Sequence, residues 1–257
     1  MNTSADHQVI VALDFADRSA AEALVARLGG ACGFYKVGLE LLTAAGPDLV
    51  RGLVDRGHEV FLDLKLFEIP NSVAGAVRAA GALGASMVTV HSMGGTGIMT
   101  AAVDAAREFP GLRVLALTVV TSMTGSDLTD IGIGSGRGGS GSGSGVSTDE
   151  QVLRLARLAA EAGCDGVVGS PREAGPLRRL LGPDRLIVTP GVTLPGGETG
   201  GEAGGHARSD HARSDTPWAA FAAGASHVVV GRSVTRATDP VAALRRVAAG
   251  PRGAAGR

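Results

Sequence analysis

The sequence predicts an α/β protein, a (β/α)8 TIM barrel, and three observations lead to this prediction. Eight short runs rich in β-branched and apolar residues recur along the 257 residues. Each run is followed by a stretch with helical spacing that is rich in Ala, Leu and Arg. The runs are apolar nearly throughout rather than at alternate positions, which is typical of strands buried on both faces of a parallel sheet.

The predicted strands are residues 9–15, 34–39, 59–65, 87–91, 113–121, 166–170, 186–192 and 227–232. Eight strands that alternate with helices in a chain of this length favour a closed barrel. An open, doubly wound parallel sheet is the alternative. We expect a single domain over residues 1–257.

Two helices carry clear signals. One is expected to begin near Asp149, because Asp149 and Glu150 suit the positively polarised N-terminus of a helix and Gly163 follows its end. The last helix is expected at Asp239-Pro240, an N-cap followed by proline at the first helical position. The first of these helices has an apolar stripe spaced i, i+3, i+4 and i+7, consisting of Val152, Leu155, Ala156 and Ala159.

Two Gly-rich segments interrupt this rhythm, at about 134–145 and 196–215. The first reads GSGRGGSGSGSG, and the second contains HARSD twice in tandem, at 206–210 and 211–215. Both are expected to be flexible loops, since they contain little that could be buried. The duplication is local, because five residues cannot form a structural repeat. Its basic residues either contact an anion or are simply solvated.

Composition and charge exclude several classes of protein. The formal net charge of −1 gives no field that would recruit nucleic acid or an anionic membrane. Cys32 and Cys164 lack CxxC spacing, so a disulfide framework or thiolate metal site is not expected and a reducing cytoplasm fits best. The N-terminus is short and polar, and we find no secretory signal and no apolar run of membrane-spanning length. A soluble, cytoplasmic protein is expected.

Polar residues cluster where the predicted strands end. In a barrel of this type, chemistry takes place at the C-terminal ends of the strands. Any one of these residues alone is more often structural, but together they predict a single polar mouth. They are Asp14, Lys36, Asp63, Lys65, His91, Thr121, Ser122, Ser170 and Arg232.

The strongest local pattern is DLKLFEIPN, residues 63–71. Asp63 and Lys65 are two apart on a strand, so their side chains should share one face. A lysine beside carboxylates stays charged, and it can donate a proton and stabilise negative charge. The alternative is a structural ion pair inside the barrel. Asn71-Ser72 is expected to cap the next helix, with Pro70 ending the loop.

This segment resembles the DxKxxDIPN motif of orotidine 5′-monophosphate decarboxylases. The resemblance continues, in family order, through FYKVGLEL, VTVHSMGG, LALTVVTSMTGSDL, VVGSPREA, LIVTPGV and HVVVGRSVTRATDP. A lone DxK is weak evidence, whereas seven ordered segments that cover nearly the whole chain outside the Gly-rich loops are specific.

The resemblance implies decarboxylation of orotidine 5′-monophosphate to uridine 5′-monophosphate in pyrimidine biosynthesis, with no metal or organic cofactor. Lys65 would stabilise and protonate the C6 carbanion, and Asp63 would lie against the substrate carboxylate. Lys36 would belong to the charged network and, with Asp14, contact the ribose hydroxyls. Members of the family are homodimers with active sites at the interface, so Glu68 would reach the neighbouring subunit's site.

The other implied contacts are with the base and the phosphate. Ser122 would hydrogen-bond the pyrimidine, and Arg232 would hold the 5′-phosphate together with backbone N–H groups of the last two loops. The resemblance also implies substrate binding by Ser72, Pro190, His211 and Gly231. The expected partner is a small nucleotide, not nucleic acid or a membrane.

Three positions depart from the family pattern. Glu68 replaces Asp, which displaces the carboxylate by about 1.5 Å. Thr193 stands where Arg is usual, and His211 (or His206) where Gln is expected to contact phosphate. These changes affect the carboxylate delivered between subunits and phosphate recognition, and they leave Lys36, Asp63 and Lys65 in place.

Three other functions are compatible with the sequence. A specialised paralogue would act on a modified or non-phosphorylated orotidine-like nucleoside or nucleotide. A related barrel that handles sugar phosphates would need a divalent metal and be inhibited by chelators. A catalytically silent protein would bind uridine monophosphate without turning over orotidine monophosphate.

Overall fold

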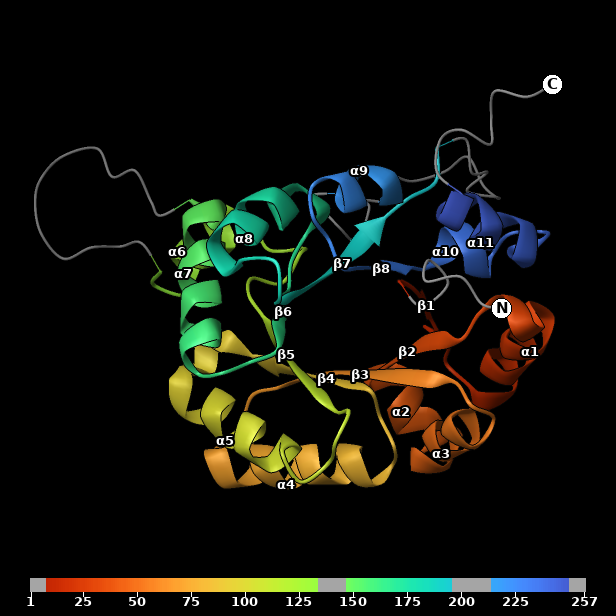
Figure 1. The fold of residues 1–257 in the computed structure, drawn as a ribbon, viewed down its shortest axis with the longest axis horizontal. Coiled ribbons are helices and arrows are strands. Elements are labelled where there is room, and N and C mark those ends of the chain that lie inside the picture. The colour runs from red at the N-terminus through yellow and green to blue at the C-terminus, as the bar shows by residue number, and fades with distance from the viewer. Residues whose placement is uncertain (1–7, 134–146, 196–213, 250–257) are drawn as a thin grey trace, which may run out of the picture.

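Eight parallel strands close into a barrel in strand order β1 to β8 (Figure 1). The structure is a computed structural model, which describes residues 8–133, 147–195 and 214–249. The first strand pairs with the last, for example Val9 with Val228, so the open-sheet alternative is wrong. The strands are β1 Val9–Ala12, β2 Phe34–Gly38, β3 Glu59–Leu66, β4 Met87–His91, β5 Arg113–Leu117, β6 Gly166–Val168, β7 Leu186–Val192 and β8 His227–Val230.

All eight predicted strands are present, and five of them end earlier than predicted, β2 by a single residue. The predictions for β1, β5, β6 and β8 ran two to four residues too far, into the segments that follow the strands. Those segments keep strand-like composition because the mouth of the barrel is itself partly buried. Thr118 and Val119, for example, are fully buried after the end of β5.

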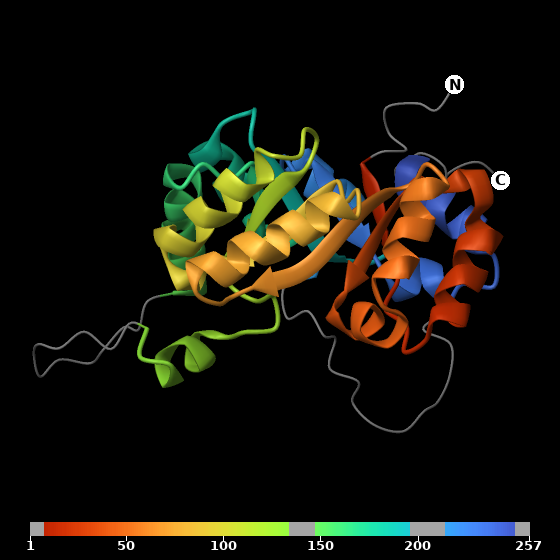
Figure 2. The ribbon, with the colours of Figure 1, turned by 90° about the horizontal axis from the view of Figure 1, so that it is seen from below.

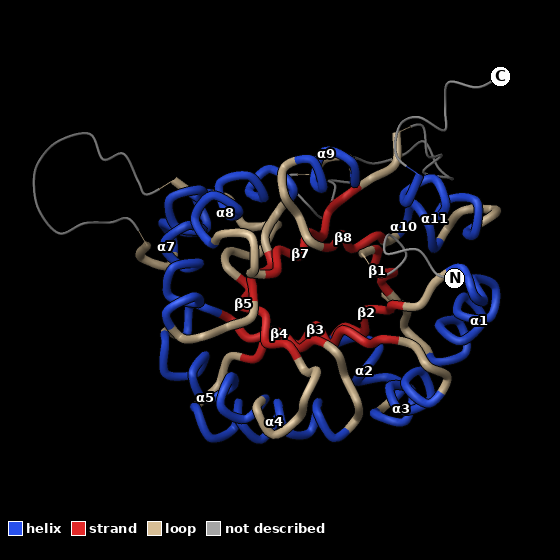
Figure 3. The backbone as a smooth tube through the Cα atoms, viewed as in Figure 1, coloured by secondary structure: helices blue, strands red, loops and turns tan. Residues whose placement is uncertain are grey.

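The helices surround the ring of strands (Figure 3). The side view of Figure 2 shows the short helix α6 set apart from the larger helices. The helices are α1 Arg18–Leu28, α2 Leu39–Ala45, α3 Pro47–Asp55, α4 Pro70–Ala82, α5 Thr96–Ala106, α6 Gly125–Asp130, α7 Thr148–Glu161, α8 Ala174–Leu181, α9 Pro217–Ala222, α10 Arg232–Thr235 and α11 Pro240–Ala249. Three short 3-10 helices lie at Gly29–Ala31, Ser92–Gly94 and Pro171–Glu173.

The two helices with clear sequence signals are confirmed. At the start of α7, the Ser147 hydroxyl accepts from the Glu150 N–H at 3.2 Å, and the Glu150 carboxylate accepts from the Ser147 N–H at 3.1 Å. All four residues of the predicted apolar stripe of α7 are buried. At the start of α11, the Asp239 carboxylate accepts from the Ala242 N–H at 2.9 Å.

The predicted cap of α4 is wrong. The helix begins at Pro70, and Ile69 is the capping residue, with no side-chain hydrogen bond. Asn71 and Ser72 are exposed in the first turn. Proline favours the first helical position because its φ is already helical and its missing N–H would have no partner there. The helix therefore starts before the polar pair.

The barrel interior changes from apolar to polar along the strands. Its apolar layer includes Phe34 and Phe61, each about 1% exposed, and burying such a side chain contributes about 1.5–3 kcal/mol. Side chains two apart on a strand point the same way. The next inward positions on β2, β3 and β4 are Lys36, Asp63 and Thr89. The strands thus carry polar groups towards the mouth above an apolar floor.

The two cysteines are free and buried. Burial raises the pKa of the Cys32 thiol to about 11 and that of Cys164 to about 12, so both remain protonated thiols at neutral pH. Within the described ranges, no helix is long and apolar enough to span a bilayer.

The Gly-rich segments predicted to be flexible lie almost wholly outside the described residues, as do His206 and His211. Ser214 and Asp215, at the end of the second segment, are described. Asp215 forms an isolated parallel bridge with Val192, and its carbonyl accepts from the Thr193 N–H at 3.0 Å. Thr193 and Asp215, which lie before and after the undescribed residues, are therefore direct neighbours in space.

Candidate active site

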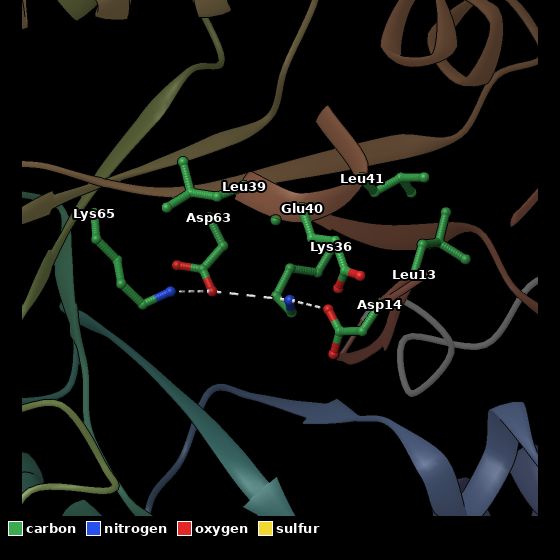
Figure 4. A pocket seen from close by; sticks show the side chains of 9 residues that line it. Leu13, Asp14, Lys36, Leu39, Glu40, Leu41, Asp63 and Lys65 are labelled. Atoms are coloured by element: carbon green, nitrogen blue, oxygen red, sulfur yellow. Dashed lines mark hydrogen bonds and ion pairs between the residues drawn. The ribbon is translucent and has the colours of Figure 1, made fainter. Parts of the chain in front are cut away.

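Four charged side chains of alternating sign form a row at the mouth of the barrel (Figure 4). The Lys36 Nζ lies 2.8 Å from the Asp14 Oδ1 and 3.9 Å from the Asp63 Oδ2. The Lys65 Nζ lies 2.8 Å from the same Asp63 Oδ2. We call Asp14, Lys36, Asp63 and Lys65 the charged row. Its central carboxylate is held between two ammonium groups.

The row is buried in its middle and open at its ends. The side chains of Lys36 and Asp63 are 10% and 15% exposed, whereas those of Lys65 and Asp14 are 36% and 62% exposed. An isolated buried charge costs several kcal/mol, so the central pair depends on its neighbours of opposite sign. The Lys65 ammonium is also paired with the Asp63 carboxylate, but the Lys65 side chain is more exposed than the central pair.

The backbone at Lys65 is unusual. Lys65 has φ 49°, and it is the only non-glycine residue with positive φ among the described residues. A non-glycine residue in this region costs about 1–3 kcal/mol and is found mostly at functional sites. The register of β3 against β4 also shifts between Leu62 and Leu66. Asp63 and Lys65 therefore do meet, but through an irregular strand rather than the plain alternation predicted from their spacing.

Thr89 on β4 contacts both members of this pair. Its hydroxyl accepts from the Lys65 N–H at 2.8 Å and donates to the Asp63 Oδ1 at 3.1 Å. Thr89 is fully buried. The sequence pattern does not single out this residue, because threonine is common in strands. Its inward position, two residues after Met87, is the signal that would have found it.

A cavity of about 310 Å³ opens beside the charged row. All four charged residues line it, and Ala12, Leu117, Val168 and Val229 add an apolar part. On the β7–β8 side, the lining consists of Pro190, Gly191, Val192, Thr193, Ser214, Gly231, Arg232 and Ser233. Such a cavity, with charged groups on one side and an apolar surface between, suits a polar molecule with a flat ring.

A smaller cavity of about 200 Å³ also reaches the charged row. Its additional lining comes from Leu13 and from the segment Gly38 to Leu41 at the end of β2. Leu39 in this segment is 56% exposed. The four residues of the charged row therefore line both cavities.

His91 lies near the row as a neutral ring. Burial, and then the Lys65 ammonium, lower its pKa below the ordinary value of 6.5. Its Nδ1 accepts from the Met93 N–H at 3.3 Å, and the Phe67 ring is tilted against it at 5.7 Å. Neither His91 nor Ser170, two residues of the predicted mouth, is among those that line the larger cavity.

The sequence model of the orotidine 5′-phosphate decarboxylase / HUMPS family matches residues 7–247. The chain belongs to this family. It is 45% identical over 252 residues to orotidine 5′-phosphate decarboxylase of Moorella thermoacetica, covering 95% of this chain and 92% of the relative. It is 44% identical over 243 residues to the enzyme of the same name from Anaeromyxobacter dehalogenans, covering 95% of this chain and 97% of the relative.

Solved structures agree with the family assignment. The crystal structure of orotidine 5′-phosphate decarboxylase from Lactobacillus acidophilus is similar with a TM-score of 0.77 and 34% identity, covering 93% of this chain and 96% of that one. An uncharacterized conserved protein from Geobacillus kaustophilus is similar with a TM-score of 0.74 and 33% identity, covering 93% and 97%.

The structure brings most of the residues implied by the family motif together. Seven of them line the larger cavity: Asp14, Lys36, Asp63, Lys65, Pro190, Gly231 and Arg232. Glu68, Ser72 and Ser122 are exposed and do not line it. Of the departures from the family pattern, Thr193 lines the cavity, Glu68 does not, and His211 lies outside the described residues.

Proposed function

We propose that this protein decarboxylates orotidine 5′-monophosphate to uridine 5′-monophosphate without a cofactor. One observation carries the proposal: the Asp63 carboxylate, with ammonium groups at 2.8 and 3.9 Å, lines a cavity in a member of this family. The relatives that bear the decarboxylase name match nearly the full length of the chain. Barrels of this type carry their chemistry at the C-terminal ends of the strands, and Asp63 and Lys65 lie at that end of β3.

The charged row supplies the groups that the reaction needs. When the bond between C6 and the carboxylate carbon breaks, CO2 leaves and the electron pair remains on C6. The Lys65 ammonium stabilises this charge and then donates a proton to C6, and solvent reprotonates the amine. This interaction lowers the barrier because it is stronger in the transition state than with bound substrate. Asp63, beside the substrate carboxylate, repels a charge that disappears as CO2 leaves.

The remaining lining residues suit the rest of the nucleotide. Asp14 and Lys36 would contact the ribose hydroxyls. Arg232 would bind the 5′-phosphate with backbone N–H groups near Gly231, and this is supported by their place in the lining of the same cavity. Phosphate binding away from C6 supplies energy that orients the reacting ring.

We propose that the protein acts as a homodimer in which Glu68 completes the partner's site. Glu68 is exposed and does not line the cavity of its own chain. Phe67 and Ile69, on either side of it, are each 62% exposed, which is typical of an apolar surface that a partner covers. The smaller cavity beside Leu39 gives an incoming carboxylate a route to the charged row.

We also propose a single-domain, cytoplasmic protein. Strands from both ends of the chain close one barrel, and the two buried thiols are compatible with a reducing compartment. Limited proteolysis and cell fractionation would test these two points.

A decarboxylation assay tests the proposed function. We expect release of CO2 from orotidine 5′-monophosphate, much slower release from orotidine, and no change on addition of EDTA. Preference for orotidine would support a specialised paralogue, and loss of activity with EDTA would indicate a metal-dependent reaction. Binding of uridine monophosphate without any turnover would contradict the proposal and indicate a silent nucleotide-binding protein.

A further inference from the structure

Beside the charged row, β3 contains two more residues than the stretch of β4 with which it pairs. Leu62 pairs with Val88 and Leu66 with Val90, so four steps along β3 match two steps along β4. The two extra residues form a bulge that contains Asp63 and Lys65. Thr89 is the one β4 residue between these two pairs, so it alone faces the bulge from that strand.

Thr89 uses both hydrogen-bonding capacities of its hydroxyl at this point. The oxygen accepts from the Lys65 N–H at 2.8 Å, and the hydrogen is donated to the Asp63 Oδ1 at 3.1 Å. This leaves the Asp63 Oδ2 to the ammonium groups of Lys65 and Lys36, at 2.8 and 3.9 Å. The two carboxylate oxygens thus have separate partners, which fixes the plane of the carboxylate.

We propose that Thr89 is a positioning residue for decarboxylation, which holds the Asp63 carboxylate and the left-handed backbone of Lys65 in their reactive geometry. This inference rests on the proposed function. Thr89 does not line the cavity, so it acts through its two neighbours and not on the substrate. Without the hydroxyl, the Lys65 N–H loses its acceptor and the Asp63 carboxylate can rotate about its bond.

Four variants test the role of Thr89. Thr89→Val keeps the shape and removes the hydroxyl, Thr89→Ser keeps the hydroxyl, and Thr89→Cys provides a weaker hydrogen-bonding group. Thr189→Val is the matched control, because Thr189 is also fully buried on a strand and its hydroxyl donates to the His227 carbonyl at 3.2 Å, away from the row.

We expect kcat for orotidine monophosphate to fall roughly 10–100-fold in Thr89→Val, because a small misplacement of reacting groups has effects of this size. KM should stay within about threefold, since the substrate's own contacts remain. Thr89→Ser should be within about threefold of wild type, Thr89→Cys intermediate, and Thr189→Val near wild type. The order serine, cysteine, valine remains testable if Thr89→Val fails to fold.

Hydrogen exchange of the Lys65 amide, followed by NMR, provides a readout that needs no turnover. Exchange should be at least about tenfold faster in Thr89→Val than in wild type or Thr189→Val, because the amide has lost its acceptor. Unchanged exchange, or an unchanged kcat despite faster exchange, would overturn the inference. If the wild type does not decarboxylate orotidine monophosphate, the proposed function fails, and exchange at Lys65 alone decides whether Thr89 holds this geometry.

Discussion

The two sides of the barrel mouth are built in different ways. On the β1–β3 side, each charged group is in contact with a neighbour of opposite sign, and the central carboxylate is 15% exposed. On the β7–β8 side, the residues that line the cavity are mostly small or apolar, and the charged residue among them, Arg232, is exposed. The first side is fixed by the protein before any ligand arrives.

This difference matches the two tasks of the proposed reaction. Charge develops at a single ring carbon, and groups that stabilise it are effective only when they are already oriented. A phosphate dianion is recognised by its charge and oxygens, so an accessible cation and backbone N–H groups are sufficient. Substitutions on the β1–β3 side should therefore lower kcat, and those on the β7–β8 side should raise KM.

The largest effect is expected for Lys65→Ala. Removal of the ammonium should lower kcat by at least about 10³-fold, with binding of uridine monophosphate largely retained, because the lost interaction belongs to the transition state. Single-turnover kinetics and product-binding calorimetry would measure the two quantities. Near-normal kcat in a folded variant would contradict the assignment of the chemistry to the charged row.

A mixture of two inactive variants tests whether the β1–β3 side is completed by a second chain. Glu68→Ala alone should lower activity by about 10²-fold. When it is mixed equally with Lys65→Ala, half of the dimers should be heterodimers with one intact site of two, which restores about a quarter of wild-type activity. A mixture that stays inactive after confirmed subunit exchange would refute the shared site.

Arg232→Ala tests the other side of the mouth. Loss of a charge-assisted hydrogen bond is worth about 1.5–3 kcal/mol, so KM for orotidine monophosphate should rise roughly 10–100-fold while kcat changes little. Arg236→Ala is the control, because Arg236 is exposed at the end of α10 and does not line the cavity. A loss confined to kcat would erase the proposed contrast between the two sides.

The smallest effect is expected far from the mouth, at His227. Burial lowers the pKa of this histidine below 6.5, with Glu59 opposing, and its ring packs edge-on against Phe34 at 6.1 Å. Below pH 6.5 the unfolded chain binds a proton that the folded protein resists, so stability falls as pH falls. Between about pH 7.5 and about pH 5, His227→Gln should lose a few degrees less in Tm than wild type. Equal losses in Tm for the variant and the wild type would show that His227 does not contribute to the loss of stability in acid.

The sequence predicts the strands better than it predicts the site. The strand positions follow from runs such as that of β1, VIVA, where burial on both faces requires apolar residues throughout. The pairing of Asp63 with Lys65 was predicted from their spacing, but the bulge that brings them together depends on register against β4, which is a long-range property. The sequence pattern does not single out Thr89, because threonine is common in strands, and its role is visible only once β4 is aligned with the bulge. The cap of α4 was misplaced because Pro70 competes with Asn71 for the start of the helix.

The bridge between Val192 and Asp215 marks a position where residues can be inserted into the chain. Because the Thr193 N–H is bonded to the Asp215 carbonyl, the chain between them starts and ends at fixed neighbouring points. Doubling the length of a flexible connection between fixed ends costs only about 0.6 kcal/mol, so the five-residue HARSD duplication is expected to be nearly neutral for stability. An insertion between these two fixed ends should therefore leave the barrel intact, which offers a position for a reporter domain attached where β7 ends.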